Sequence, residues 1–185
     1  MILTMITCII LGMGVPTTAN YVIMATTCAP ILKSMGMNYF AANMFVFYFG
    51  IVADITPPVA LAAYAGAAIA GSKPMTTAFN ATQLAIAAFI VPFIFGLNPA
   101  LLFINTNAVE VIIIIITSLI GIFGVASGLR GYALRETEPI QRLMMIIGGL
   151  LLIYPGTFTD IIGTLLIISS IAIDLYILKN AKTNI

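Results

Sequence analysis

Residues 111–129 form an isoleucine-rich stretch without a single charged residue, long enough to cross a membrane as one helix. A bilayer has a hydrocarbon core roughly 30 Å thick, which about 20 apolar residues span as an α-helix. The whole chain of 185 residues has this character, because 62% of its residues are hydrophobic and only 7% are charged. Its apolar stretches lack the alternating polarity of membrane barrel strands. We therefore expect an all-α integral membrane protein with several spans.

Composition also limits the functions that these residues can carry. A net charge of +1 provides no strongly basic surface for nucleic acid. No histidine is present, so a Ser-His-Asp triad and a histidine proton relay are excluded within this sequence. An intramembrane protease with two facing aspartates is an alternative, with Asp54, Asp160 and Asp174 as candidates, but the glycine context usual in such enzymes is missing. We expect no enzyme activity and no cofactor apart from a coupling ion.

Two pairs of apolar segments are separated by residues that interrupt helices. Residues 12–18 separate the first pair and residues 54–58 separate the second. Most of these segments are too short to cross the bilayer alone. Irregular backbone at membrane depth is tolerated only where protein buries it or where it lines a wet cavity, because unpaired N–H and C=O groups are costly in lipid. We therefore expect each break to face a site.

The residue types in the breaks are suited to a cation and to an anion. Glycines permit left-handed backbone or close approach, and prolines remove N–H donors and so free carbonyl groups. Together with hydroxyls and a carboxylate, these carbonyls are hard oxygen ligands suited to Na⁺. The expected sodium ligands, largely backbone carbonyls, are Gly12, Gly14, Asp54, Thr56 and Pro57. The start of the helix after a break attracts anions, and the expected substrate-binding residues are Thr17, Thr18 and Asn20.

Simpler interpretations of these residues exist. A proline in a membrane helix, backed by threonine hydroxyls, is often only a bend or a packing notch. We interpret Pro30 and Pro92 in this way, and we expect a kink at Pro92 within a span over residues 75–97. Asp54 could instead cap the helix that starts near Val59. Clustering of glycine or acid with threonine and proline nevertheless favours a transporter site at both breaks.

Long strings around the two breaks resemble a known family. The strings "LGMGVPTTANYVIMATTCAP" and "FVFYFGIVADITPPVALAAYAGAAIAG" are similar to the signature regions of the large permease component of TRAP transporters. They most resemble the fused permeases that work with TAXI-type solute-binding proteins. The likeness continues through "NATQLAIAAFIVPFIFGLNPALL" and so covers residues 1–102 closely. The C-terminal spans resemble, more loosely, the extra helices of the fused forms.

The resemblance implies an elevator-type architecture with inverted repeats. Residues 1–104 would be the second-repeat transport region, with a re-entrant hairpin at 1–34, a broken helix at 38–71 and a spanning helix at 75–104. Residues 105–185 would be additional transmembrane helices. The apolar start of the sequence, without a basic flank or a cleavage site, is typical of a chain entered midway, so that we expect a C-terminal portion of the permease.

The same resemblance implies a function and partners. The function is sodium-coupled import of an organic anion, a carboxylate, delivered by a periplasmic TAXI-type solute-binding protein. The other implied partners are the first-repeat half of the permease, helices like those of the small subunit, and the lipid bilayer. The location is the cytoplasmic (inner) membrane of a bacterium or archaeon. A truncated membrane scaffold or relic that transports nothing is the alternative.

Charges allow a test of this topology. If the hairpin re-enters and the broken helix crosses, Lys33 lies on one face of the membrane and the other six basic residues lie on the opposite face. These six are Lys73, Arg130, Arg135, Arg142, Lys179 and Lys182. Basic loops are predominantly cytoplasmic, so we expect the six in the cytoplasm and residues 105–107 in the periplasm.

Overall fold

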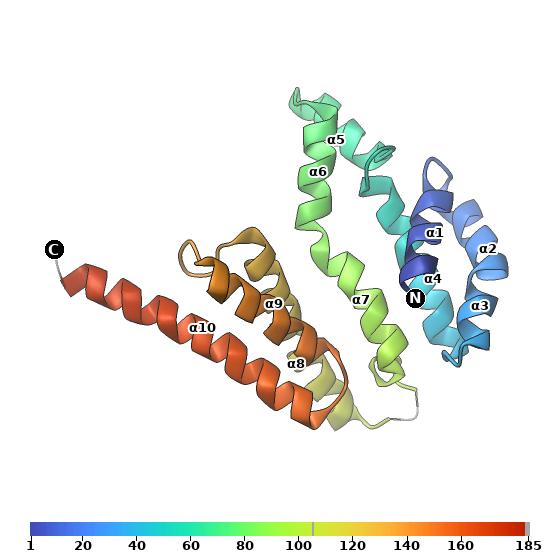
Figure 1. Cartoon of the computed structure of the whole chain (residues 1–185). Coiled ribbons are helices and arrows are strands. Elements are labelled where there is room, and N and C mark those ends of the chain that lie inside the picture. Colours follow the sequence, from blue (N-terminus) through green and yellow to red (C-terminus); the bar gives the residue numbers. More distant parts are fainter. Residues whose placement is uncertain (105, 184–185) are drawn as a thin grey trace. The chain divides into compact units, whose positions relative to one another are not determined.

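The chain is built from helices that form two compact units, residues 1–102 and residues 103–185 (Figure 1). The computed structural model describes residues 1–104 and 106–183, with side chains as far as Lys179, so that Asn105 and the side chain of Lys182 lie outside the described residues. Over those ranges no β-strand occurs, and Tyr132 and Glu136 form one isolated bridge. The expected all-α fold is confirmed there.

The first unit, here called unit 1, contains both predicted breaks. Its elements are α1 (Ile2–Gly12), α2 (Thr17–Thr27), α3 (Ala29–Ser34), α4 (Tyr39–Val52), the 3₁₀ helix η1 (Ala53–Ile55), α5 (Leu61–Ala70), α6 (Pro74–Leu84), α7 (Ile86–Leu97) and the 3₁₀ helix η2 (Pro99–Leu102). α1 has 11 residues, a length of roughly 16 Å, and therefore reaches only about halfway across a bilayer. Figure 1 shows α1 running to a tight loop from which α2 returns beside it.

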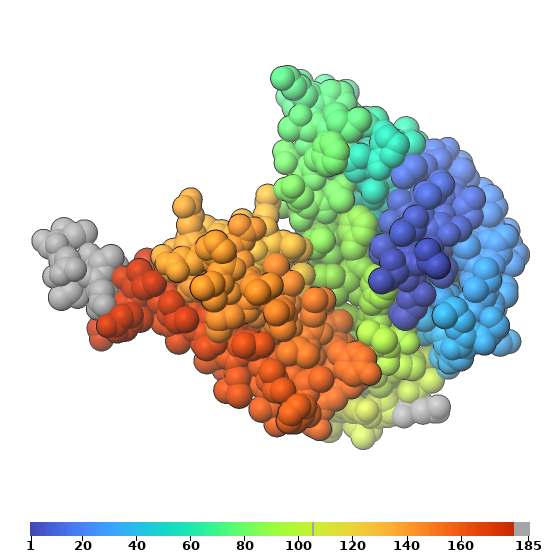
Figure 2. Space-filling view, viewed as in Figure 1, coloured from blue at the N-terminus to red at the C-terminus, as the bar shows by residue number. Residues whose placement is uncertain are grey.

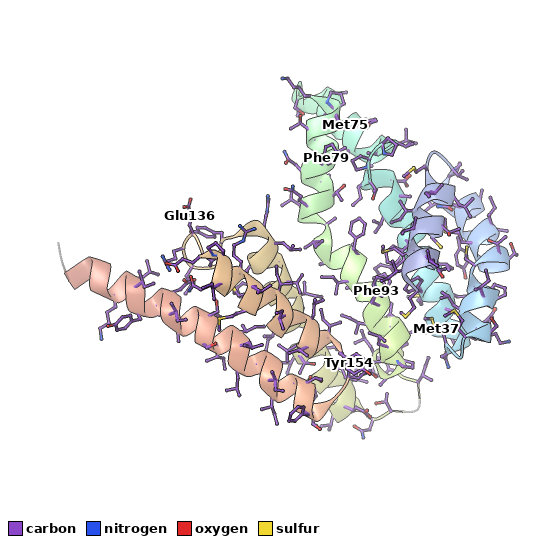
Figure 3. All side chains as sticks on the ribbon, viewed as in Figure 1. Met37, Met75, Phe79, Phe93, Glu136 and Tyr154 are labelled. Atoms are coloured by element: carbon purple, nitrogen blue, oxygen red, sulfur yellow. The ribbon has the colours of Figure 1, made fainter. Side chains whose placement is uncertain are left out.

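The core of unit 1 is centred on α4. Its fully buried Phe45 and Phe49 pack in one cluster with residues of α1, α2 and α3. Phe93 of α7, which is labelled in Figure 3, meets both rings edge to face, with centroid distances of 5.4 and 5.8 Å. In the space-filling view, the blue atoms of α1 to α3 form one continuous part of the surface of unit 1 (Figure 2). This packing fixes the hairpin against the broken helix.

The helix over residues 75–97 is interrupted at Ala85, a position that the sequence did not predict. α6 and α7 meet there at 41°, whereas Pro92 is buried inside α7. The cause is a change of packing partner. α6 packs against α5 and η1, and α7 packs against α4. The predicted single helix over residues 75–104 is therefore two helices followed by η2.

In the second unit, here called unit 2, the described residues form the helices α8 (Ala108–Arg130), α9 (Pro139–Ile153) and α10 (Thr157–Thr183). α9 packs against both α8 and α10. Glycines let the backbones approach closely, since a Cβ atom added to Gly121 of α8 would lie 2.8 Å from the carbonyl oxygen of Gly149 in α9. Small residues at such contacts are typical of helix pairs in membranes.

Helix lengths agree with a multi-pass membrane protein. Among the described residues, two helices are long and apolar enough to cross a bilayer, Ala108–Arg130 and Thr157–Lys179. The bent pair of α6 and α7 makes a third if it counts as one span. The apolar helices of the hairpin and the broken helix are shorter, as the sequence predicts.

Candidate functional site

Both glycines of the first break have the backbone roles expected of them. Gly14 has φ +77°, in the left-handed region that other residues rarely adopt. Gly12 is buried at the end of α1, where an added Cβ atom would lie 2.8 Å from the Cβ of Ala53 and 3.3 Å from the carbonyl oxygen of Gly50. The tip of the hairpin therefore depends on glycine for its conformation at one position and for close approach at the other.

The two breaks lie against each other. Gly12 faces Ala53, which is the first residue of η1 and directly precedes the second break. A Cβ atom on Gly14 would lie 3.8 Å from the side chain of Val59, near the other end of that break. Segments that are more than 40 residues apart in the sequence thus form one structural region.

Asn20 of α2 is buried in this region and connects α2 to α4. Its side chain is only 1% exposed, and its Nδ2 donates a hydrogen bond of 3.1 Å to the carbonyl oxygen of Gly50. Its Oδ1 is also buried, and no described residue donates to it. A buried acceptor without a donor is energetically costly, so Oδ1 needs a partner. Sequence reasoning grouped Asn20 with substrate-binding residues but did not anticipate its burial.

Thr17 and Thr18, the other two expected substrate-binding residues, are in a different environment. Both are exposed in the first turn of α2. The residue before this helix is Pro16, and no side chain caps the helix. The first N–H groups of a helix have no partner inside the helix. The start of α2 therefore presents N–H groups and two hydroxyls at the tip of the hairpin.

Two carbonyls of the second break, those of Ile55 and Pro58, and the carbonyl of Val52 just before it already accept a hydroxyl. Thr56 donates to Val52 at 2.7 Å, and Thr82 of α6 donates to Ile55 at 3.0 Å. The hydroxyl of Tyr64 donates to the carbonyl of Pro58. These bonds hold the break in its irregular conformation and remove three oxygens from the list of free ligands.

The carbonyl of Asp54 is different. In a helix its donors would be the N–H groups three and four residues later, but Pro57 and Pro58 occupy those positions and have none. The double proline therefore leaves this oxygen free of any helical bond. It lies in the same break as the half-buried carboxylate of Asp54 itself.

The alternative role of Asp54 as a helix cap is wrong. The helix after the break is α5, which begins at Leu61 with Ala60 as its N-cap and has no side-chain cap. A capping side chain binds the N–H groups two or three residues further along, whereas Asp54 lies seven residues before Leu61. η1 and the proline turn occupy the intervening chain.

Residues 1–109 match the family model of the tripartite ATP-independent periplasmic transporter, DctM component. The chain belongs to this family. Both breaks of the DctM-family chain lie inside the matched residues, and the match ends at the start of α8. Comparisons with curated proteins and with solved structures found no significant match. The resemblance to the large TRAP permease component is thereby confirmed, and the chain is a component of a membrane transporter.

Membership in the DctM family, which consists of transporters, also disfavours the protease alternative. Asp160 and Asp174 both lie in α10, where 14 positions separate them, a distance of roughly 21 Å. They cannot face each other across one substrate bond. Asp174 is moreover paired with Arg135 in unit 2, at 2.9 Å between Nε and Oδ1.

The ion pair of Arg135 and Asp174 is a feature that the sequence did not predict. From the sequence, the arginines between residues 130 and 142 are expected only to set the orientation of the chain in the membrane. In the structure, Arg135 binds the fully buried carboxylate of Asp174. Arg142 donates to the carbonyls of Gly128 and Leu129 at the end of α8. The available signal was Asp174 itself, because a charged residue inside an apolar helix requires a partner.

Proposed function

We propose that this chain is part of a sodium-coupled TRAP-type permease that imports an organic anion, a carboxylate. Its DctM-family match supports the transporter class. Sodium as the coupling ion is supported by the chemistry of the breaks, which present oxygen ligands and no histidine or cysteine. The observation that carries the proposal is Asn20, which connects α2 to α4 beside the two breaks and has a buried Oδ1 to which no described residue donates.

The proposed sodium site lies where the hairpin tip meets η1. Its ligands come from the predicted set of Gly12, Gly14, Asp54, Thr56 and Pro57, to which we add Asn20 through its Oδ1. The hydrogen bond from Nδ2 to the carbonyl of Gly50 fixes the Asn20 side chain. A cation bound to Oδ1 would then satisfy this buried acceptor. The proline-freed carbonyl of Asp54 supplies a second neutral oxygen, and its carboxylate supplies the charge.

The proposed substrate site is at the start of α2. Exposed N–H groups and the positive end of the helix dipole favour a carboxylate. The hydroxyls of Thr17 and Thr18 provide two further donors at the same exposed turn. Because Asn20 follows within one turn, sodium and substrate would share α2, which gives a structural route for coupling their binding.

The wider assembly is part of the same proposal. We propose that residues 1–104 are the second inverted repeat of an elevator-type transport domain, and that residues 105–185 are the extra helices of a fused, TAXI-type form. The partners are a periplasmic TAXI-type solute-binding protein, the first repeat and helices like those of the small subunit. The location is the inner membrane of a bacterium or archaeon.

The test is uptake by the complete permease with its binding protein, reconstituted in vesicles with and without a sodium gradient. We expect uptake only with sodium, and the Asn20→Ala variant should need a higher sodium concentration for half-maximal uptake. Asn43→Ala is the matched control, because Oδ1 of Asn43 already accepts from Tyr21 at 3.2 Å. Uptake that ignores sodium would reject the coupling ion. No uptake at all by the complete system would favour a membrane scaffold.

A further inference from the structure

A buried carboxylate in unit 2 is only half satisfied by protein atoms. Asp174 of α10 is fully buried, and its Oδ1 accepts hydrogen bonds from Nε of Arg135 at 2.9 Å and from Nε2 of Gln141 at 3.0 Å. Its Oδ2 is also buried, and no described residue donates to it. An ionised oxygen in an apolar interior without a donor is strongly unfavourable. The geometry therefore requires a partner for Oδ2.

Gln141 cannot be that partner. Its Oε1 accepts from the backbone N–H of Glu138 at 3.1 Å and from Nη2 of Arg135 at 3.2 Å. Its Nε2 donates to Asp174 at 3.0 Å and to the carbonyl of Ser170 at 3.5 Å. The amide thus makes all four hydrogen bonds that it can make. This fixes its orientation and leaves no donor for Oδ2.

Ser170 provides a second unsatisfied group on the same face of α10. It is fully buried, and its Oγ makes no hydrogen bond to any described residue. It precedes Asp174 by four residues, so the two side chains are neighbours one turn apart. The adjacent Ser169 behaves differently, because its hydroxyl donates to the carbonyl of Leu166 at 2.9 Å. Two buried side chains, each with an oxygen to which the described residues give no partner, therefore lie one helical turn apart.

A proton, a metal cation or a water molecule could provide the missing partner of Asp174 Oδ2 and Ser170 Oγ. The charge that each would add distinguishes these three possibilities. A proton on Oδ2 would leave Arg135 without its counterion. A metal cation would add a positive charge to an ion pair that is already neutral, which a low-dielectric interior disfavours. A water molecule adds no charge, donates to Oδ2, and either donates to or accepts from Oγ.

We propose that unit 2 holds a buried, ordered water molecule that bridges Oδ2 of Asp174 and Oγ of Ser170. The hydrated pair holds the Asp174 carboxylate in place and ties the loop over residues 131–138 to α10 through Arg135. Asp174 thereby has a structural role, because it links α10 to Arg135 and to Gln141 of α9. This inference is independent of the proposed sodium site, since every residue in it belongs to unit 2.

The test compares two neighbouring serines in the full chain. Removal of a buried hydroxyl that has no partner should stabilise a protein, whereas removal of one bound to water should destabilise it. We expect Ser170→Ala to lower the thermal unfolding midpoint by several degrees more than Ser169→Ala, equally in sodium chloride and in choline chloride. A midpoint for Ser170→Ala equal to or above that of Ser169→Ala would overturn the water site. A loss seen only in sodium would also overturn it, in favour of a cation.

An experimental density map provides a second readout. We expect a peak within hydrogen-bonding distance of both Asp174 Oδ2 and Ser170 Oγ, with two to four polar neighbours as usual for buried water. A map of the same quality without this peak, or with five or six oxygen ligands around it, would contradict the proposal.

Discussion

Nδ2 of Asn20 donates a 3.1 Å hydrogen bond to the carbonyl oxygen of Gly50, and this bond joins the helix after the first break to the helix before the second. The two residues are 30 positions apart in the sequence. Gly12 lies against both, because a Cβ atom there would be 2.6 Å from Nδ2 of Asn20 and 3.3 Å from the Gly50 oxygen. A change at the hairpin tip should therefore be transmitted to the broken helix.

Gly12→Ala tests this junction. The added methyl group would lie 2.6 Å from Nδ2 of Asn20 and 2.8 Å from the Cβ of Ala53, so the hairpin must shift. We expect a loss of about 1 to 3 kcal/mol in stability, as for other overpacked cores, together with reduced sodium-dependent uptake. Gly66→Ala in α5 is the control, because a Cβ atom there meets nothing within 4 Å. Equal stability of the two variants, measured by thermal unfolding, would show that the junction is loose.

Gly14→Val tests the left-handed backbone at the tip. A valine at φ +77° costs about 1 to 3 kcal/mol of local strain and should turn the tip carbonyls away from the ion. We expect transport by the complete permease to be abolished while membrane insertion is retained. Gly14→Asn should keep part of the activity, since asparagine tolerates this conformation better. Wild-type uptake by the valine variant would reduce residues 12–18 to a packing kink.

Asp54→Asn tests the charged ligand of the proposed sodium site. The variant keeps the size of the side chain and the proline-freed carbonyl but removes the negative charge. We expect the sodium concentration for half-maximal uptake to rise roughly tenfold, equivalent to about 1.4 kcal/mol. The apparent substrate affinity should fall at low sodium, because the two binding reactions are linked. Titration of uptake against sodium measures both, and an unchanged curve would remove Asp54 from the site.

Single cysteines at positions 73 and 107 test the topology. Lys73 and Asn107 are both exposed, and the native Cys8 and Cys28 are buried, so background labelling should be low. We expect a membrane-impermeant thiol reagent to reach position 73 only from the cytoplasm and position 107 only from the periplasm. The unlabelled parent chain serves as the control. Labelling of both positions from one side would contradict the predicted arrangement, in which Arg135 and Lys182 are also cytoplasmic.

Arg135→Ala tests the ion pair of Arg135 and Asp174 in unit 2. It leaves Asp174 buried without a counterion, and we expect a loss of about 3 to 5 kcal/mol in stability. The double variant Arg135→Met with Asp174→Leu removes both charges and should recover most of that loss. Thermal unfolding of the parent, the single variant and the double variant measures these differences in stability. A single variant as stable as the parent would mean that the pair contributes nothing.

Residue types alone identified the breaks, because their physical basis is local. Proline lacks an N–H group and glycine lacks a Cβ atom wherever they occur, so residues 12–18 and 54–58 had to interrupt helices. Apolar length likewise predicted the span at α8, which runs from Ala108 to Arg130. The bend at Ala85 could not be predicted in this way. It lies where the packing partners change, because α6 packs against α5 and η1 whereas α7 packs against α4.

The sequence by itself determined that this chain lies in a membrane, that it is helical, and that two of its segments are broken, since each property follows from the chemistry of short stretches. Only the tertiary structure decided which groups meet. It buried Asn20 on Gly50 and left its Oδ1 without a donor, it separated Asp54 from the start of α5, and it joined Arg135 to Asp174 across 39 positions. Such partners are chosen by the packing of whole helices, and that packing depends on contacts between residues far apart in the chain.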